Sequence, residues 1–165
     1  MKHMTAPTII QLAAVLLTGL VAGLFYGYDC SVIKGLGNLP DKEYLGAFQS
    51  INRAILNPYF FLSFAGSLIL LPVACWLSFR AGNTQAAYFL LAASLLYLTG
   101  VFLVTAAANV PLNDLLDRFN LLTGTPETIS AFRKKFETGW NRWHQIRTFA
   151  SVLTFLLSLL SIIKR

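Results

Sequence analysis

The stretch Trp140-Asn-Arg-Trp-His-Gln-Ile-Arg147 leads directly into an apolar run, residues 148–163. Read as a helix, Trp140, His144 and Arg147 are spaced i, i+4 and i+7, so they share one face. A bilayer core needs about 20 helical residues, and counting back from the end of the run reaches that length near His144. A histidine and an arginine therefore lie at the hydrocarbon boundary, where charge is costly unless it faces the bundle interior or a wet cavity. We call the group Trp140, His144 and Arg147 the polar corner, and we treat the rest of the chain as the scaffold that holds it.

Composition places the whole chain in a membrane. Of its 165 residues, 56% are hydrophobic and only 12% are charged, whereas soluble domains carry about 25% charged residues. Length and hydropathy predict one integral-membrane domain over residues 1–165, with the lipid bilayer as its surroundings. The net charge of +6 does not indicate nucleic-acid binding, because the basic residues flank apolar runs rather than forming a dense patch.

The first apolar run, residues 8–28, has two readings. A cleaved signal peptide is one, because Lys2 precedes an apolar stretch with small residues. We favour a retained span, because the run is long enough to cross a bilayer and carries Gly19, Gly23 and Gly27. Two consecutive GxxxG steps allow another helix to approach closely, so a homo-oligomer through these glycines is one expectation.

Three further spans are expected, which predicts an all-α bundle of four transmembrane helices. Residues 29–40 are expected to form a loop, and residues 41–56 an amphipathic helix that lies at the membrane surface or caps the bundle. The helix restart expected at Pro111 follows from its fixed φ, and Gly139 is expected to bend the start of the fourth span. The remaining spans are 59–79, kinked at Pro72, 85–108, and the run that follows Trp140.

Both termini are expected on one side and both long connections on the other. The positive-inside rule, by bare count of Lys and Arg, favours the long connections in the cytoplasm. Arg80 and Lys164-Arg165 directly follow span ends, however, and we favour cytoplasmic termini in the plasma (inner) membrane. Because Met4 offers a second start, residues 1–3 are expected to be an added leader, and His3 is given no chemical role.

Polar side chains gather at one membrane level, where an up-down bundle brings four helix ends together. Along the fourth helix a thin polar stripe continues inward from His144 and indicates that this face is interior. The site candidates at that level are Tyr26, Asn57, Asn109, Asn113, Trp140, His144 and Arg147, and Tyr28, Asp29 and Trp143 lie at the same level. The stripe is Thr148, Ser151, Thr154 or Phe155, and Ser158.

Chemically, His144 is the candidate general acid or base, because an imidazole ordinarily titrates near neutrality. Arg147 is suited to hold an anionic intermediate, and Asn109 and Asn113 to orient a substrate oxygen. We expect Trp140, Tyr26 and Asn57 to contact a flat, hydrophobic small molecule arriving from the bilayer.

Each candidate also has a purely structural interpretation. Trp140 can serve as an interfacial anchor, Arg147 can snorkel to headgroups, the asparagines can cap helices, and His144 can be a packing histidine. Their convergence at one level favours the functional interpretation.

The sequence offers little for metal or cofactor binding. There is one credible histidine, and the spans hold no paired carboxylates and no Cys/His cluster, so no metal site is expected. Cys30 and Cys75 fall at different depths and no CxxC occurs, so neither a disulfide nor dithiol chemistry is expected. No cofactor is predicted, although haem on His144 alone, or a bound quinone, stays open.

Two motifs carry a family resemblance. Asn109-Val-Pro-Leu-Asn113 after the third span and Trp140-x-x-x-His144-x-x-Arg147 in the fourth resemble the anthrone oxygenase-like membrane family, as do the early glycines and Phe48-Gln-Ser-Ile-Asn52. Fungal members are associated with oxidising anthrones to anthraquinones with molecular oxygen, without metal or flavin. The resemblance implies that His144 removes a ring proton and that Arg147, Asn109 and Asn113 stabilise the enolate oxygen.

A different class stays open. The alternative is a non-enzymatic membrane subunit or a lipid- or quinone-binding module, in which the polar corner is a structural network and residues 41–56 serve a partner.

Overall fold

The computed structural model describes residues 5–163, so the predicted leader lies outside the described residues. Between residues 5 and 163 the chain forms only helices, turns and short connections. Four helical stretches are long and apolar enough to cross a membrane, which indicates an integral membrane protein: Ala6–Gly37, Pro58–Arg80, Thr84–Arg118 and Pro126–Ile163. The predicted all-α bundle of four transmembrane helices is confirmed.

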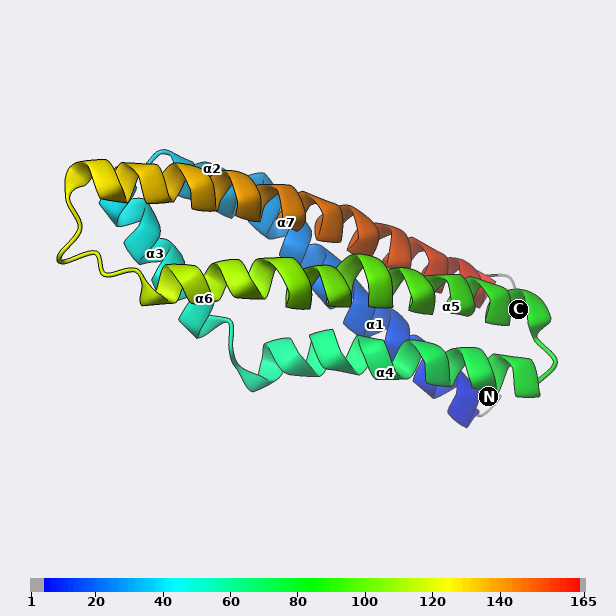
Figure 1. Ribbon diagram of the computed structural model, residues 1–165. Coiled ribbons are helices and arrows are strands. Elements are labelled where there is room, and N and C mark those ends of the chain that lie inside the picture. The colour runs from blue at the N-terminus through cyan, green and yellow to red at the C-terminus, as the bar shows by residue number, and fades with distance from the viewer. Residues whose placement is uncertain (1–4, 164–165) are drawn as a thin grey trace.

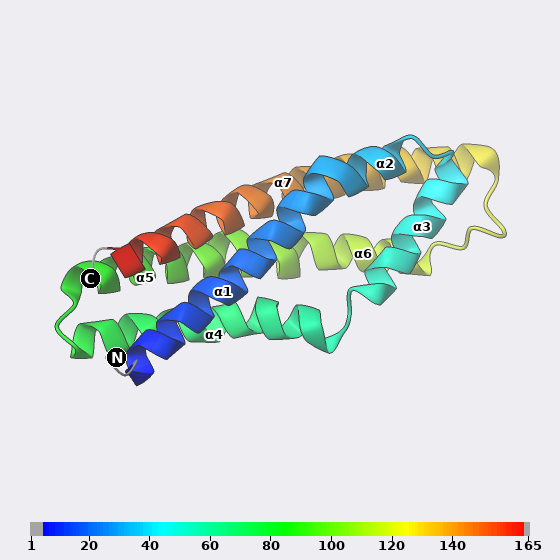
Figure 2. The same cartoon turned by 180° about the vertical axis from the view of Figure 1, so that it is seen from behind.

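The four long helices form a ring in which α1 packs against α4 and α7, and α5 also packs against α4 and α7. Both termini and the α4–α5 turn lie at one end, and the two long connections at the other (Figures 1 and 2). The elements are α1 (Ala6–Gly27), η1 (Tyr28–Val32), α2 (Ile33–Gly37), α3 (Asp41–Ala54), α4 (Pro58–Arg80), α5 (Thr84–Leu96), η2 (Tyr97–Leu103), η3 (Thr105–Asn109), α6 (Val110–Arg118) and α7 (Pro126–Ile163).

The loop expected over residues 29–40 is mostly helix. A π-helical segment, η1, continues α1 into α2, so the chain leaves helical geometry only after Gly37. Ile33 and Leu36 pack against a core cluster at this end of the bundle. That apolar contact outweighs the helix cost of glycine, about 1 kcal/mol per residue.

The third span does not stop at Asn109 either, so the expected break before Pro111 is wrong. Helix α5 continues through η2 and η3 into α6 as one stretch. Proline inside a membrane helix is tolerated where local π-helical turns satisfy the freed backbone groups, and η3 ends two residues before Pro111. Helix α7 runs unbroken through Gly139, and α4 through Pro72, and the bend and the kink predicted at these residues stay predictions.

Helix α3 is the predicted amphipathic helix, and it crosses the end of the bundle between α2 and α4 (Figure 2). Its apolar face buries Tyr44, Leu45 and Phe48. Burial raises the pKa of the Tyr44 phenol above its ordinary range, and nearby Glu137 adds to that rise. Tyr44 therefore packs as a neutral ring.

Arg133 of α7 clamps this end of the bundle. Its guanidinium donates to Asp41 at 2.9 Å and to Glu137 at 3.1 Å. It also donates to the carbonyls of Leu39 and Gly37 at 2.7 and 2.9 Å. The Asp41 carboxylate and two carbonyls thus join α7 to the α2–α3 connection, and Glu137, on α7 itself, adds a second carboxylate beside Arg133.

The predicted polar stripe of α7 faces the bundle interior. His144, Thr148, Ser151, Thr154 and Ser158 are all buried, which confirms the sequence interpretation. Farther along, Gln11 of α1 donates to Ser161 at 2.7 Å, and Thr18 lies 3.3 Å from Ser158. These contacts form a hydroxyl-rich α1–α7 seam.

Glycines allow the closest helix approaches. A Cβ added at Gly100 would lie 2.7 Å from the Ala150 Cβ, and one at Gly19 would lie 2.9 Å from the Phe155 ring. Gly19 therefore packs inside its own chain, whereas nothing lies within 4 Å of a Cβ added at Gly23 or Gly27. A homo-oligomer contact would have to use those two alone.

Candidate functional site

The site lies where two hydrophobic cores meet. One core fills the middle of the four-helix ring, and the other lies under α3 and includes Trp140. One helical turn beyond Trp140, α7 presents His144 and Arg147 to the same interior face. The exposed fractions of these three residues are 3%, 1% and 8%. The i, i+4, i+7 spacing thus places all three inside the protein, as predicted.

His144 has a defined protonation pattern. Its Nε2 lies 3.2 Å from the Phe25 carbonyl oxygen, which can only accept a hydrogen bond. Its Nδ1 accepts hydrogen bonds from Arg147 Nε at 3.1 Å and from Nη2 at 3.0 Å, because a guanidinium can only donate. His144 is therefore the neutral tautomer with the proton on Nε2 and the lone pair on Nδ1.

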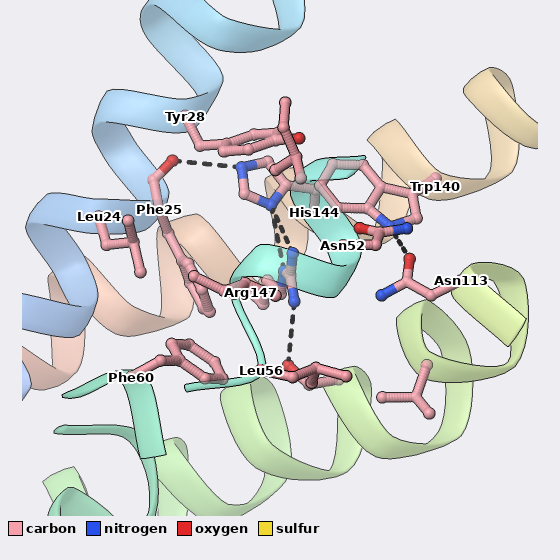
Figure 3. Close-up of a pocket in the computed structure, with 14 residues that line it drawn as sticks. Leu24, Phe25, Tyr28, Asn52, Leu56, Phe60, Asn113, Trp140, His144 and Arg147 are labelled. Carbon is pink, nitrogen blue, oxygen red and sulfur yellow. Dashed lines mark hydrogen bonds between the residues drawn. The ribbon is translucent and has the colours of Figure 1, made fainter. Parts of the chain in front are cut away.

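Aromatic rings fix the imidazole from both sides. Trp140 stacks on it with centroids 4.8 Å apart and planes at 14°, and Tyr28 meets it edge-on at 5.4 Å. The indole is anchored in turn, because its Nε1 donates to Asn113 Oδ1 at 2.7 Å (Figure 3). Helices α1, α6 and α7 therefore hold one rigid arrangement around His144.

Arg147 is a buried cation without an acidic partner. None of the ion pairs between described residues involves it. Its guanidinium lies over the Phe25 ring at 4.4 Å and near the Trp140 ring at 5.1 Å, and Nη1 lies 3.4 Å from Thr105 Oγ1. Uncompensated buried charge is costly, so this position favours a ligand that brings negative charge or a strong acceptor.

A cavity opens in front of these residues. Its volume is about 100 Å³, which is smaller than the roughly 300–1,000 Å³ of typical small-molecule sites, so a larger ligand would extend through its open mouth. The polar wall consists of Tyr28, Asn52, Thr105, Asn113, His144 and Arg147. The rest of the lining is apolar or aromatic: Leu24, Phe25, Ile51, Ile55, Leu56, Phe60, Val110 and Trp140.

The mouth of this cavity is hydrophobic. Leu56, in the α3–α4 connection, is 66% exposed, and Val110, at the start of α6, is 42% exposed. The most exposed lining residues are therefore apolar, which suits the entry of an apolar molecule. Polarity increases inward, toward Arg147 and His144.

The structure brings four of the seven candidates together. Trp140, Asn113, His144 and Arg147 all line the cavity. Asn109, fully buried, instead donates to the Trp140 carbonyl at 3.3 Å, behind the indole. Tyr26 is 62% exposed on α1. Asn57 caps α4 by accepting from the Phe60 amide at 3.0 Å.

These last three residues do not line the cavity. A ligand would meet Tyr26 or Asn57 only outside it. Asn109 acts through Trp140, whose backbone it holds.

Two polar residues of the cavity, Thr105 and Asn52, were not among the sequence candidates. Tyr28, which the sequence placed at the same level, takes the position beside His144 instead of Tyr26, because η1 turns it inward. The i, i+4 spacing from Thr105 to Asn109 was a usable signal for Thr105. Asn52 ends the Phe48-Gln-Ser-Ile-Asn52 motif, but its position on the polar face of α3 gave no reason to expect it at the cavity.

The cavity wall offers few ligands for a metal ion or a haem iron. Within residues 5–163, no three His, Cys, Asp or Glu side chains lie close enough together to hold a metal ion. Both His144 nitrogens already have partners, so a haem iron at His144 would have to displace one of those bonds. Cys30 is exposed and Cys75 is buried, and both are free thiols.

Comparison with known proteins gives one match. The family model described as anthrone oxygenase matches residues 60–157, which include Asn109, Asn113, Trp140, His144 and Arg147. No curated protein and no solved structure matches the chain.

Proposed function

Because the chain belongs to the anthrone oxygenase family, we propose that it oxidises a hydrophobic, anthrone-like aromatic ketone with molecular oxygen, using His144 as the base. The overall conversion is balanced: the ring CH₂ and O₂ become a ring C=O and water. His144 takes one proton from the CH₂, and the ring becomes an electron-rich enolate. The enolate transfers electrons to O₂ and forms a C–O bond, and the His144 imidazolium returns its proton to the peroxide anion. Loss of water from the resulting hydroperoxide gives the quinone.

The observation that carries this proposal is the buried Arg147 guanidinium, which has no carboxylate and faces an apolar cavity. A developing enolate oxygen supplies the negative charge that this position lacks. Preorganised donors of this kind contribute about 10²–10³ in rate where a charge develops. Asn109 supports this end of the substrate through Trp140, whose carbonyl it holds. The Asn113 amide N–H, left free by the bond from Trp140 to Oδ1, is available to a substrate oxygen.

The same geometry suggests the order of events. In the free protein the His144 lone pair on Nδ1 is occupied by Arg147. A substrate oxygen that takes over the guanidinium releases Nδ1, so binding itself activates the base. The Phe25 carbonyl stays on Nε2–H and stabilises the imidazolium that forms, the role a carboxylate plays in other histidine sites.

Oxygen uptake with anthrone, measured on the detergent-purified protein, tests this function. We expect His144→Ala to lower the rate about a hundredfold or more, which is the usual contribution of a general base. The control is Gln145→Ala, which alters the exposed neighbour on the same helix. An unchanged rate in His144→Ala would contradict the role of His144 as the base. If the unaltered protein takes up no oxygen, the proposed activity itself is wrong.

A second candidate, a quinone- or lipid-binding module without catalysis, has its own observation. The bonds His144–Phe25, Trp140–Asn113 and Arg147–Thr105 join four helical elements, as a structural network would. An absorption spectrum of the purified protein separates the two. A visible band favours a bound quinone or haem, whereas unfolding of His144→Ala and Arg147→Ala favours the structural network.

A further inference from the structure

One polar side chain in the cavity wall has no partner. Asn52 projects from the last turns of α3 and lines the cavity, and its Nδ2 is buried without an acceptor anywhere in residues 5–163. Figure 3 shows Asn52 among the side chains that line the cavity. A buried donor left unpaired is costly, so this amide is a position where a ligand group is expected.

The neighbours of Asn52 on α3 are paired, which makes the contrast specific. Gln49 Nε2 donates to the Leu116 and Phe119 carbonyls at 2.8 and 3.0 Å. Arg53 donates to Asp117 at 2.7 Å. These two residues hold α3 against α6, and the helix turn between them places Asn52 at the cavity instead.

A second amide faces the same space from α6. Asn113 Oδ1 accepts from the Trp140 indole at 2.7 Å, which fixes the orientation of the amide. Its Nδ2 consequently points away from Trp140 (Figure 3) and donates to no residue that the structure describes. The cavity therefore contains two amide donors in addition to the Arg147 guanidinium.

We propose that Asn52 is a ligand-contacting residue which, with Asn113, binds a second oxygen of the ligand, separate from the oxygen held by Arg147. This inference rests on the proposed function for the first oxygen. It defines the ligand as a fused aromatic molecule with at least two oxygen functions, one becoming anionic at Arg147 and one carbonyl or hydroxyl at the amide pair. Helix α3 then determines specificity, beyond its part in capping the bundle.

Binding under argon tests this without turnover. The probes are anthrone, with one oxygen, and 1,8-dihydroxyanthrone, with three, each titrated into the full-length protein in detergent while tryptophan fluorescence is followed. We expect Asn52→Leu to lower affinity for the dihydroxy probe about tenfold, the equivalent of one hydrogen bond. The affinity of Asn52→Leu for anthrone should stay within about twofold of that of the unaltered protein, because anthrone lacks the second oxygen.

Thermal unfolding gives the second readout. Because Asn52 has no partner to lose, we expect Asn52→Leu to unfold at the same temperature or higher. The matched control is Asn141→Leu. Asn141 also has a buried amide atom without a partner but does not line the cavity, so both affinities stay unchanged. If Asn52→Leu does not fold, the same affinities and unfolding temperature are measured for Asn52→Ala, with the same expected results.

The outcomes separate the two proposals. Equal losses for both probes, no loss for either, or a markedly lower unfolding temperature overturns the role of Asn52 and leaves the proposed function in place. Selective loss for the dihydroxy probe without any oxygen uptake supports Asn52 and overturns the oxygenase activity. If the unaltered protein binds neither probe, both proposals fall.

Discussion

Helix α7 carries two arginines that are largely shielded from solvent, and their surroundings are opposite. Arg133 has a 14% exposed side chain with two carboxylates and two backbone carbonyls around it. Arg147 is 8% exposed and has a neutral histidine, a hydroxyl and two aromatic faces. Because an uncompensated buried charge is costly, the difference supports a structural role for Arg133, which joins helices, and the proposed ligand-binding role for Arg147.

Removing the Arg147 charge gives the largest expected effect, and it should appear in activity. We expect Arg147→Gln to lower oxygen uptake with anthrone about 10²–10³-fold, because the developing oxyanion loses its cation. The unfolding temperature in detergent should change little, since no ion pair is lost. Arg142→Gln is the matched control: it removes an exposed cation from the same helix and should change neither readout. A large drop in unfolding temperature for Arg147→Gln would contradict the comparison.

Arg133→Gln should show the reverse pattern. It leaves Asp41 and Glu137 without their cation, and we expect a loss of about 2 kcal/mol in unfolding free energy. That is less than for fully buried pairs, because the Asp41 side chain is 38% exposed and solvent screens it. Oxygen uptake per folded molecule should stay near that of the unaltered protein. A hundredfold loss of activity without destabilisation would show that both arginines serve the site.

The indole–amide bond tests how tightly the corner must be held. Trp140→Phe keeps a ring on His144 but removes the Nε1–H donor to Asn113. We expect about tenfold lower oxygen uptake and a loss of about 1 kcal/mol in stability, the usual value of one hydrogen bond. Trp143→Phe, at a position 37% exposed, should leave both unchanged. Equal effects at the two positions would mean that ring anchoring, and not the amide, matters.

Much of the corner was predictable from spacing alone. The 3.6-residue period placed Trp140, His144 and Arg147 on one interior face of α7, and the hydroxyl stripe indicated which face it was. The ends of the helices were harder to predict. Local residue preferences indicate a break near Gly35 and Pro111, but the π-helical segments η1 and η3 continue into further helix there. Inward rotation of Tyr28 at η1 followed from the same feature.

Asn52 was unpredictable for a different reason. The amphipathic pattern of α3 puts Asn52 on the polar face of the helix, and a polar face ordinarily contacts water. Because α3 crosses the end of the bundle, that face meets α6 and the cavity instead. Only the tertiary arrangement could reveal this.

The α1–α7 seam provides the smallest expected effect and the sharpest control for the polar corner. Gln11 and Ser161 are as buried as His144, yet they carry no charge and line no part of the cavity around Arg147. Gln11→Leu removes the 2.7 Å bond to Ser161, but Ser161 keeps its bond to the Ser158 carbonyl at 2.6 Å. We expect a loss of about 0.6 kcal/mol, the average for such bonds between membrane helices, measured by thermal unfolding, with oxygen uptake unchanged. Reduced uptake in Gln11→Leu would mean that buried polarity along the α1–α7 seam also supports the reaction, whereas unchanged uptake would agree with chemistry at the level of His144 and Arg147.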